Sequence, residues 1–499
     1  MPFAADRRLG DASAVSTRDT ILRDSVSTQR RLVLKTGIVG LAVAAAAALL
    51  ATGPFITPKA LPEAMDPAAP QRCIGVFLVC VALWVTNLIP PAATGLLAIV
   101  LLPVFNILSE REAFGLFGNS AVFFMLGVFL LAGGTISTGL SKRVTLIVLQ
   151  RFDRSPERLF TGVTVSAVFL SLWMPEHAVA AMIYPIVVEI VDTLRLQRGN
   201  SYAKKLFLGM GWGAVIGGTG TFLGGARTPL ALSMLRDVDP SARISFLGWA
   251  AAAIPVVVVM TFVAIMVLRT RVPNDIDNIK AATHMLDERV RRLGPMSGPE
   301  QRLAGLGILT IIAWITVGHT VGLAVIAILS SILLFALRIV EWRSVEGYVN
   351  WGVLVMYGGA VALGHALDET RALAWMAGRL ITPETPKVLI IVLMVGAAIL
   401  LTEVISNSAA VAILLPVGYS LGSMTGSDSV TMTLAVAIPS GLAFLLPVSS
   451  PPNAISFASG HYSVREAVKL GWPMPLVGFT VVVAVMLIWW QFVLGFNVW

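Results

Sequence analysis

The fold is decided by the stretch Thr402-Glu403-Val404-Ile405-Ser406-Asn407-Ser408-Ala409-Ala410-Val411, which places carboxyl, hydroxyl and amide side chains in the middle of a long apolar run, residues 386–420. A second apolar run, residues 159–191, carries Met174-Pro175-Glu176-His177 near its middle. Polar groups at the depth of a lipid bilayer are costly unless they face protein or a water-filled cavity. Both runs are therefore predicted to be re-entrant helical hairpins, which enter the membrane and leave it by the same face.

The rest of the chain is apolar enough to place it in a membrane. Of its 499 residues 56% are hydrophobic and 13% are charged, whereas soluble globular proteins carry roughly 25% charged residues. A helix needs roughly 20 apolar residues to cross the bilayer. Candidate spans lie near residues 34–53, 73–89, 92–108, 120–140, 206–235, 246–268, 303–318, 321–338, 350–367, 430–459 and 473–497. The predicted fold is all-α and polytopic, with about 11 transmembrane helices and two re-entrant hairpins.

The distribution of basic residues predicts the orientation. If the N-terminus is cytoplasmic, most of the 36 Lys and Arg residues fall in cytoplasmic segments, and Arg227 lies inside a predicted span. Cytoplasmic loops of membrane proteins carry such an excess. The net charge of +8 is therefore assigned to membrane orientation and not to nucleic-acid binding. We expect a multi-pass protein of the inner (plasma) membrane with its C-terminus outside.

An internal repeat relates the two halves of the chain. A shift of 231 residues superimposes identical residues in two windows. The first window pairs Asn119, Val122, Met125, Gly127 and Gly133 with Asn350, Val353, Met356, Gly358 and Gly364, and the second pairs Ala178, Ala181 and Pro185 with Ala409, Ala412 and Pro416. Under the predicted topology the first hairpin opens inward and the second outward, so the repeats are inverted. Inverted repeats with interrupted helices near the membrane midplane are typical of secondary transporters.

The repeat predicts the domain organisation. The chain divides into a cytoplasmic tail (1–33), a first repeat (34–269), a cytoplasmic linker (270–302) and a second repeat (303–499). Each repeat contains one hairpin and, after it, one broken helix. The hairpins are 159–191 and 386–420, and the broken helices are 206–235 and 430–459.

The polar turns of the second repeat have the chemistry of an ion and anion site. Hydroxyl and amide groups such as those of Ser406, Asn407 and Ser408 can donate to an anion and bind Na⁺ through their oxygens. Two consecutive prolines cannot continue helical hydrogen bonding, so Pro451 and Pro452 leave free carbonyl oxygens that suit a small cation. The predicted Na⁺ ligands are Ser406, Asn407, Ser449, Ser450 and Asn453.

These motifs resemble those of the divalent anion:sodium symporter family, the carriers of di- and tricarboxylates and sulfate. The family carries Ser-Asn-Thr at each hairpin tip and a Gly-Thr-Pro-Pro-Asn-like break in one helix of each half, which Ser406-Asn407-Ser408 and Ser450-Pro451-Pro452-Asn453 match in the second half. The resemblance covers the chain from about residue 34. It implies a homodimer with a scaffold part and a moving transport part in each protomer, and a substrate held between the hairpin tips.

The first half departs from the family pattern. Pro175-Glu176-His177 stands where Ser-Asn-Thr is expected, and Ala226-Arg227-Thr228 stands where Pro-Pro-Asn is expected. Glu176 and Arg227 could form an ion pair that replaces a bound Na⁺, because buried charges are usually paired or functional. Alternatively, Glu176 and His177 could carry protons, or Arg227 could bind the anionic substrate through both its nitrogens.

The leading hypothesis is a secondary active transporter of a small anion that works by an elevator-type movement. The family suggests a C4-dicarboxylate, citrate or sulfate as substrate, and the residues do not choose among them. The predicted substrate-binding residues are Glu176, His177, Arg227, Thr228, Ser406, Asn407, Ser408, Pro452 and Asn453. Coupling to Na⁺ is expected, with a proton-coupled carrier or an anion exchanger as alternatives. A membrane-embedded hydrolase is disfavoured, since no nucleophile lies at helical spacing beside Glu176 and His177.

Overall fold

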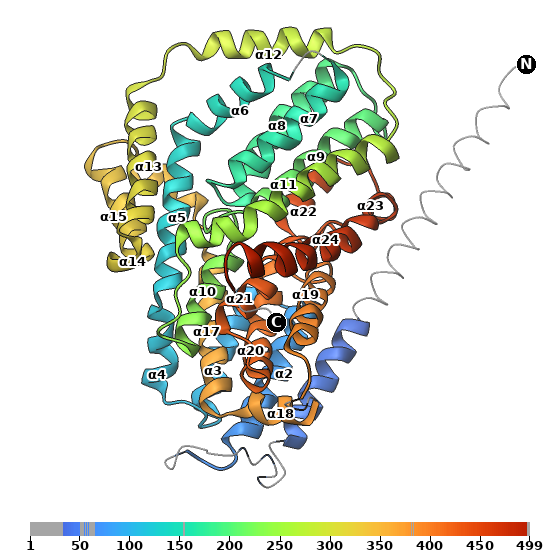
Figure 1. Ribbon diagram of the computed structural model, residues 1–499. Helices are drawn as coiled ribbons and strands as arrows, with labels where there is room; N and C mark the ends of the chain where they lie inside the picture. Colours follow the sequence, from blue (N-terminus) through green and yellow to red (C-terminus); the bar gives the residue numbers. More distant parts are fainter. Residues whose placement is uncertain are drawn as a thin grey trace, which may run out of the picture.

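The computed structural model describes residues 33–49, 54, 56, 58, 65–152, 155–380, 382 and 384–496. Every regular element in these residues is a helix (Figure 1), which confirms the all-α prediction. Five helices are long and apolar enough to cross a membrane, namely Ala69–Thr86, Glu110–Ser137, Phe246–Arg271, Asn407–Thr425 and Val464–Trp490. Several shorter apolar helices accompany them, and the number of spans stays a prediction. The predicted tail, residues 1–33, lies outside the described residues except for Val33.

The first half opens with a group of helices that precede the first hairpin. They are Val33–Leu49, α2 (Ala69–Thr86), α3 (Pro91–Val104), α4 (Glu110–Gly115), η1 (Leu116–Gly118), α5 (Ser120–Ser137) and α6 (Leu140–Gln150). The side chain of Asn119 accepts the N–H of Ala121 at 2.9 Å and so caps the start of α5. Hydropathy alone assigns residues 141–158 to a cytoplasmic loop. It therefore misses helix α6, which lies mostly within this segment.

The first hairpin consists of α7 (Pro156–Ser171) and α8 (Glu176–Thr193), which pack against each other. Ser155 caps α7 by accepting the N–H of Arg158. The turn between the helices ends at Pro175, which precedes the first residue of α8. Proline has no N–H and disfavours a helical residue before it, so Pro175 explains why the apolar run is interrupted here.

The predicted break in the first half is also present. The run 206–235 divides into α9 (Ser201–Gly217) and α10 (Arg227–Val238), which are joined by a non-helical segment. Gly224 in this segment lies so close to the hairpin turn that a Cβ there would be 2.2 Å from the carbonyl oxygen of Ser171. The glycine therefore permits the broken helix to touch the first hairpin.

A long helix and a surface helix connect the two halves. These elements are α11 (Phe246–Arg271) and α12 (Lys280–Leu293). Most of α12 is polar and only Ala282 and Leu286 are buried, which is why hydropathy reads the segment as a linker. Arg143 of α6 forms a salt bridge with Glu300 at 2.8 Å and donates to the backbone carbonyls of Leu293, Gly294 and Pro295. This fixes the end of the linker to the first half.

The second half repeats the pattern of the first. Its elements are α13 (Gly298–Thr316), α14 (Gly318–Val321), α15 (Leu323–Ala336), α16 (Trp342–Val345), η2 (Glu346–Tyr348), α17 (Trp351–Glu369), α18 (Ala372–Leu380), α19 (Lys387–Thr402), α20 (Asn407–Thr425), α21 (Ser429–Ala437), η3 (Pro439–Gly441), α22 (Pro451–Phe457), α23 (Val464–Gly471), α24 (Pro473–Ala484) and η4 (Val485–Trp490). Helices α19 and α20 form the second hairpin. The run 430–459 breaks between η3 and α22, as predicted.

The two halves interlock through glycine contacts on the repeat-related helices α5 and α17. A Cβ on Gly127 of α5 would lie 2.8 Å from Ala327 of α15, and a Cβ on Gly359 of α17 would lie 2.2 Å from the backbone of Gly95 in α3. Small residues let helix backbones approach closely in membranes. Helix α5 of the first half therefore packs against α15 of the second half, and α17 of the second half packs against α3 of the first.

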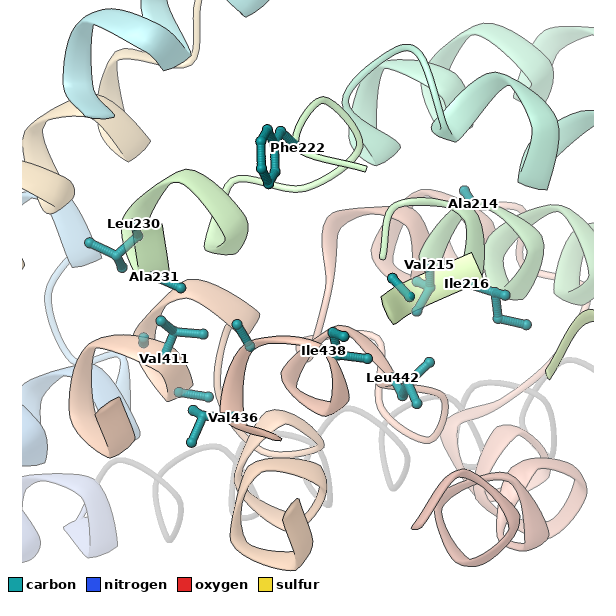
Figure 2. Close-up of a cluster of buried hydrophobic side chains, with 14 of the residues drawn as sticks. Ala214, Val215, Ile216, Phe222, Leu230, Ala231, Val411, Val436, Ile438 and Leu442 are labelled. Atoms are coloured by element: carbon teal, nitrogen blue, oxygen red, sulfur yellow. The ribbon is translucent and has the colours of Figure 1, made fainter. Parts of the chain in front are cut away.

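The broken helices and the second hairpin share one core. Figure 2 shows buried apolar side chains from the helices next to the breaks and from the second hairpin, including Leu230 of α10, Val411 of α20 and Ile438 after α21. All three are fully buried. The breaks therefore lie inside packed protein, where the lost helical hydrogen bonds can be replaced by other groups.

Candidate functional site

The tips of the two hairpins meet inside the protein. Asn407 is the first residue of α20, and its amide nitrogen donates to Glu176 Oε1 at the start of α8 over 3.3 Å. Both side chains are buried, with residue exposures of 6%. One polar turn from each repeat thus contributes to a single buried site.

Arg227 at the start of α10 joins this contact. Its guanidinium donates from Nη1 to Glu176 Oε2 at 3.1 Å and from Nη2 to Thr219 Oγ1 at 2.8 Å. The side chain of Arg227 is 1% exposed and that of Glu176 is 8% exposed. The predicted contact between Glu176 and Arg227 is therefore present in the structure, whereas its role in ion coupling stays a prediction.

The ion pair of Glu176 and Arg227 occupies a space that two glycines leave open. A Cβ on Gly441 of η3 would lie 2.2 Å from Arg227 Nη2 and 2.4 Å from Nε. A Cβ on Gly218 would lie 2.3 Å from Glu176 Oε2. Gly218 belongs to the first-half break and Gly441 to the second half, so the ion pair lies where the two breaks come together.

Gly441→Ala is expected to displace the Arg227 guanidinium and to lower the stability of the purified protein. Overpacking of a dense interior costs about 1–3 kcal/mol, and here it also strains a buried ion pair. Thermal denaturation in detergent measures the effect. The control is Gly478→Ala, because a Cβ at Gly478 meets its nearest neighbour at an ordinary 3.6 Å. Equal melting temperatures for the two variants would contradict this packing argument.

The second hairpin tip is tied to the break of its own half. Thr402 Oγ1 lies 2.7 Å from the carbonyl oxygen of Ser440 and 2.8 Å from Asn407 Oδ1. The carboxylate of Glu403 accepts the backbone N–H groups of Phe444 and Leu445 at 2.8–3.1 Å. Glu403 therefore replaces helical hydrogen-bond partners at the break, as a structural anchor would.

The predicted Na⁺ ligands of the break lie together at the start of α22. Asn453 Nδ2 donates to the carbonyl oxygen of Ala443 at 2.9 Å and to Ser449 Oγ at 3.3 Å. Ser450 caps α22 by accepting the N–H of Asn453. Since the amide nitrogen of Asn453 is held by the loop, its oxygen is the atom left to face a cation. The donor set, made of hydroxyl, amide and carbonyl oxygens, suits a hard monovalent ion.

The other predicted residues take different positions around the tips. Ser406 caps α20 by accepting the N–H of Ala409 at 3.3 Å, and its side chain is partly exposed. Ser408, Thr228 and Pro452 are buried. The last two lie at the first turns of α10 and α22, the helices that begin where each break ends.

His177 is separated from the ion pair and faces a large cavity. Its ring packs at 5.7 Å against that of Phe129 on α5. It lines a cavity of about 1090 Å³ that runs along α8 to Arg289 of α12 and reaches Asn350 and Trp351 at the start of α17. The structure thus brings Glu176 together with Arg227 and Asn407, and directs His177 toward this cavity instead.

A second cavity corresponds to the first by the internal repeat. It has a volume of about 250 Å³ and is lined by Pro416 and Ser423 of α20, together with parts of α10, α17 and α18. The shift of 231 residues places Pro185 and Asp192, which line the larger cavity, on these two residues. The two cavities lie toward opposite ends of the molecule, marked by α12 and α18 (Figure 1). The cavity at the α12 end is larger than its repeat partner.

The structure adds residues that the sequence does not single out. Thr219 and Ser440 supply oxygens to the site. Tyr357 of α17 is fully buried and lies beside Ser408, within electrostatic reach of Arg227 and Glu176. A tyrosine in the middle of the apolar run 350–367 is the one signal that could have drawn attention to it.

Comparisons with known proteins agree on one family. The family model described as the sodium:sulfate symporter transmembrane region matches residues 42–496. Two relatives named sodium-dependent dicarboxylate transporter SdcS, from Staphylococcus saprophyticus and Staphylococcus aureus, are 29% identical over 460 and 459 residues. Each alignment covers 85% of this chain and 88% of the relative.

Two solved structures are similar in fold. The Alcanivorax borkumensis YdaH transporter has a TM-score of 0.50 and 17% identity, over 75% of this chain and 87% of that one. Neisseria gonorrhoeae MtrF, described as one of a class of antimetabolite efflux pumps, has a TM-score of 0.54 and 13% identity, over 92% and 94% of the two chains. Because the family model spans nearly the whole chain, the protein belongs to the sodium:sulfate symporter family, the divalent anion:sodium symporters, and is a membrane transporter rather than an enzyme.

Proposed function

We propose that the protein is a secondary active transporter that carries a small dianion, with a C4-dicarboxylate as the leading substrate. The observation that carries the proposal is the contact between Asn407 and Glu176, which joins the two polar hairpin turns in one buried site. The SdcS relatives, named as dicarboxylate transporters, favour a C4-dicarboxylate over citrate and sulfate. The substrate would bind between the hairpin tips, close to Ser406, Ser408, Thr228 and Pro452.

The coupling ion in this proposal is Na⁺, which is carried as a co-substrate at the second-half site. Its ligands would come from Ser406 and Asn407 at the hairpin tip and from Ser449, Ser450 and Asn453 at the break. Two observations support this assignment. The donor set is rich in oxygen atoms, and Glu403 of the hairpin tip holds the backbone of the break by hydrogen bonds. The sodium-dependent relatives favour Na⁺ over the proton alternative.

At the equivalent site of the first half, the Glu176–Arg227 pair takes the place of a second Na⁺. The Arg227 guanidinium is 1% exposed and packs closely against Gly441. It would repel a cation placed beside it. The pair has no net charge, whereas an occupied Na⁺ site would carry one positive charge. The first-half contact is therefore permanent, and only the second half would load and release an ion.

Transport would proceed by an elevator-type movement of the hairpins and broken helices against the remaining helices. The two repeat-related cavities support this, because one is wide and the other narrow, as expected when one side is open. The movement would exchange their sizes. The cytoplasmic N-terminus, the external C-terminus and the homodimer are parts of the same proposal. They follow from the basic-residue distribution and the family resemblance.

Uptake by proteoliposomes tests the function. Labelled succinate is expected to accumulate when Na⁺ is higher outside than inside, and far less when K⁺ replaces Na⁺, because the ion gradient supplies the driving force. Labelled citrate and sulfate, measured in parallel, decide the substrate class. Preloading with unlabelled succinate separates net uptake from exchange. If no anion enters under any Na⁺ gradient, although the protein is folded and inserted, the proposal is wrong.

A further inference from the structure

An apolar cavity of about 250 Å³ lies on the side of the first hairpin tip. Its walls come from α5, from the end of α7 and the turn that follows it, and from one face of α13, with a smaller contribution from α6. Met174 of the hairpin turn and Ala132 of α5 line it and are otherwise buried, with exposures of 3% and 5%. The cavity therefore lies between the hairpin and helices that come before and after it in the chain.

The cavity has no group that would hold water or an ion. Among the residues that the structure describes, no charged side chain lines it. Its hydroxyl groups are already bonded within the wall, since Thr135 donates to the carbonyl oxygen of Ala132 at 2.7 Å and Thr310 to that of Leu306 at 2.7 Å. Trp314 Nε1 donates to the carbonyl oxygen of Leu323. Apolar cavities of this kind stay dry and accept apolar ligands.

The cavity is continuous with an exposed apolar surface, the kind of surface that an integral membrane protein turns to lipid. Phe169, Trp173 and Ile308 line it and are also exposed, at 43%, 40% and 61%. The adjoining face of α13 is apolar and exposed as well, through Leu309, Ile312 and Ile315. A molecule that enters from this side comes from the hydrocarbon region of the bilayer.

We infer that this cavity is a binding site for one acyl chain of a membrane phospholipid, which enters between Trp173 and Ile308 and reaches Met174. Its shape, its lack of charge, its internally bonded hydroxyls and its opening onto the lipid-facing surface all match an acyl chain. The bound chain would support the side of the first hairpin tip. The inference concerns binding alone and is independent of which anion or ion is transported.

Photo-crosslinking tests the inference on the full chain. The protein is reconstituted with phosphatidylcholine that carries a diazirine near the middle of one acyl chain, irradiated, and mapped by peptide mass spectrometry. Adducts are expected on the buried residues Met174 and Ala132 as well as on the exposed Ile308. Adducts on Ile308 without any on the two buried residues would overturn the inference, because lipid would then touch only the outer surface.

Two glycines of α13 provide a matched pair of variants. A Cβ at either Gly305 or Gly307 meets nothing within 4 Å, but only Gly307 lines the cavity. Gly307→Phe is expected to remove the adducts on Met174 and Ala132, and Gly305→Phe to keep them. Ala304→Leu, also in the wall, replaces Gly307→Phe if that variant is unstable. Adducts on Met174 and Ala132 that persist in Gly307→Phe or Ala304→Leu would also overturn the inference. The same holds if no residue of the Ile308 face carries an adduct because a second copy of the chain covers that face.

Discussion

Glu176→Gln is expected to destabilise the protein by about 3–5 kcal/mol, the cost of leaving one partner of a buried ion pair uncompensated. In the native protein Glu176 is the carboxylate partner of Arg227, whose side chain is 1% exposed. A glutamine keeps the shape and the contact with Asn407 but removes the negative charge. The guanidinium cannot give up its proton, so the charge stays buried without a counter-ion.

The opposite substitution is expected to be milder. Arg227→Gln leaves a buried carboxyl group, which can take up a proton and become neutral. The double variant Glu176→Gln/Arg227→Gln contains no buried charge at this point, and it is expected to be more stable than Glu176→Gln alone. The three variants form a double-mutant cycle, which isolates the pair energy if each substitution introduces no new contact.

Denaturation midpoints of purified protein in detergent give the comparison, and expression level gives an independent check. The control is the exposed pair Glu288–Arg292 on α12, where Glu288→Gln is expected to leave stability nearly unchanged, because exposed ion pairs contribute little. If the losses of stability in Glu176→Gln and Arg227→Gln simply add up in the double variant, Glu176 and Arg227 do not stabilise each other.

The sequence predicts the parts of this fold that chemistry makes conspicuous. Pro175 and the pair Pro451-Pro452 cannot continue a helix, and each stands at an observed interruption. The polar residues within apolar runs point to buried turns, because isolated polar groups are too costly in lipid. For the same reason Arg227, a basic residue deep inside the predicted span 206–235, is expected to find a carboxylate, and it contacts Glu176.

The remaining features depend on three-dimensional placement. Helix α12 is mostly polar and α6 is short, with several polar residues, so a search for apolar spans misses both, although Arg143 and Glu300 hold this region together. Tyr357 belongs to an ordinary apolar helix and becomes part of the site only because α17 passes the second hairpin tip. The sequence also cannot separate His177 from Glu176. They are adjacent in the chain, yet one lines the large cavity and the other binds Arg227.

The site is electrically asymmetric between its two halves. In the first half the positive charge belongs to Arg227 and is always present, with Glu176 as its partner. In the second half the polar turn around Asn453 is neutral, and the carboxylate of Glu403 beside it is engaged by backbone N–H groups. A cation that binds here would therefore be the sole mobile positive charge to accompany a dianionic substrate.

This asymmetry predicts the response of transport to Na⁺. Initial rates of succinate uptake, measured against Na⁺ concentration in proteoliposomes, are expected to follow a hyperbolic curve with a Hill coefficient near one. Asn453→Leu removes the amide that donates to the Ala443 carbonyl and that would face the ion in the proposed site. It is expected to raise the half-saturating Na⁺ concentration by about tenfold or more, which corresponds to about 1.4 kcal/mol of binding energy.

Two further variants make this measurement decisive. Ser449→Ala removes a single hydroxyl from the same loop and is expected to weaken Na⁺ activation in the same direction but by less, since Ser449 also contacts Asn453. Asn278→Leu, at an exposed position of the linker, is the control and is expected to leave the Na⁺ curve unchanged. A Hill coefficient clearly above one in the native protein would show that more than one Na⁺ binds, and the Glu176–Arg227 pair could then not be the substitute for the first-half ion.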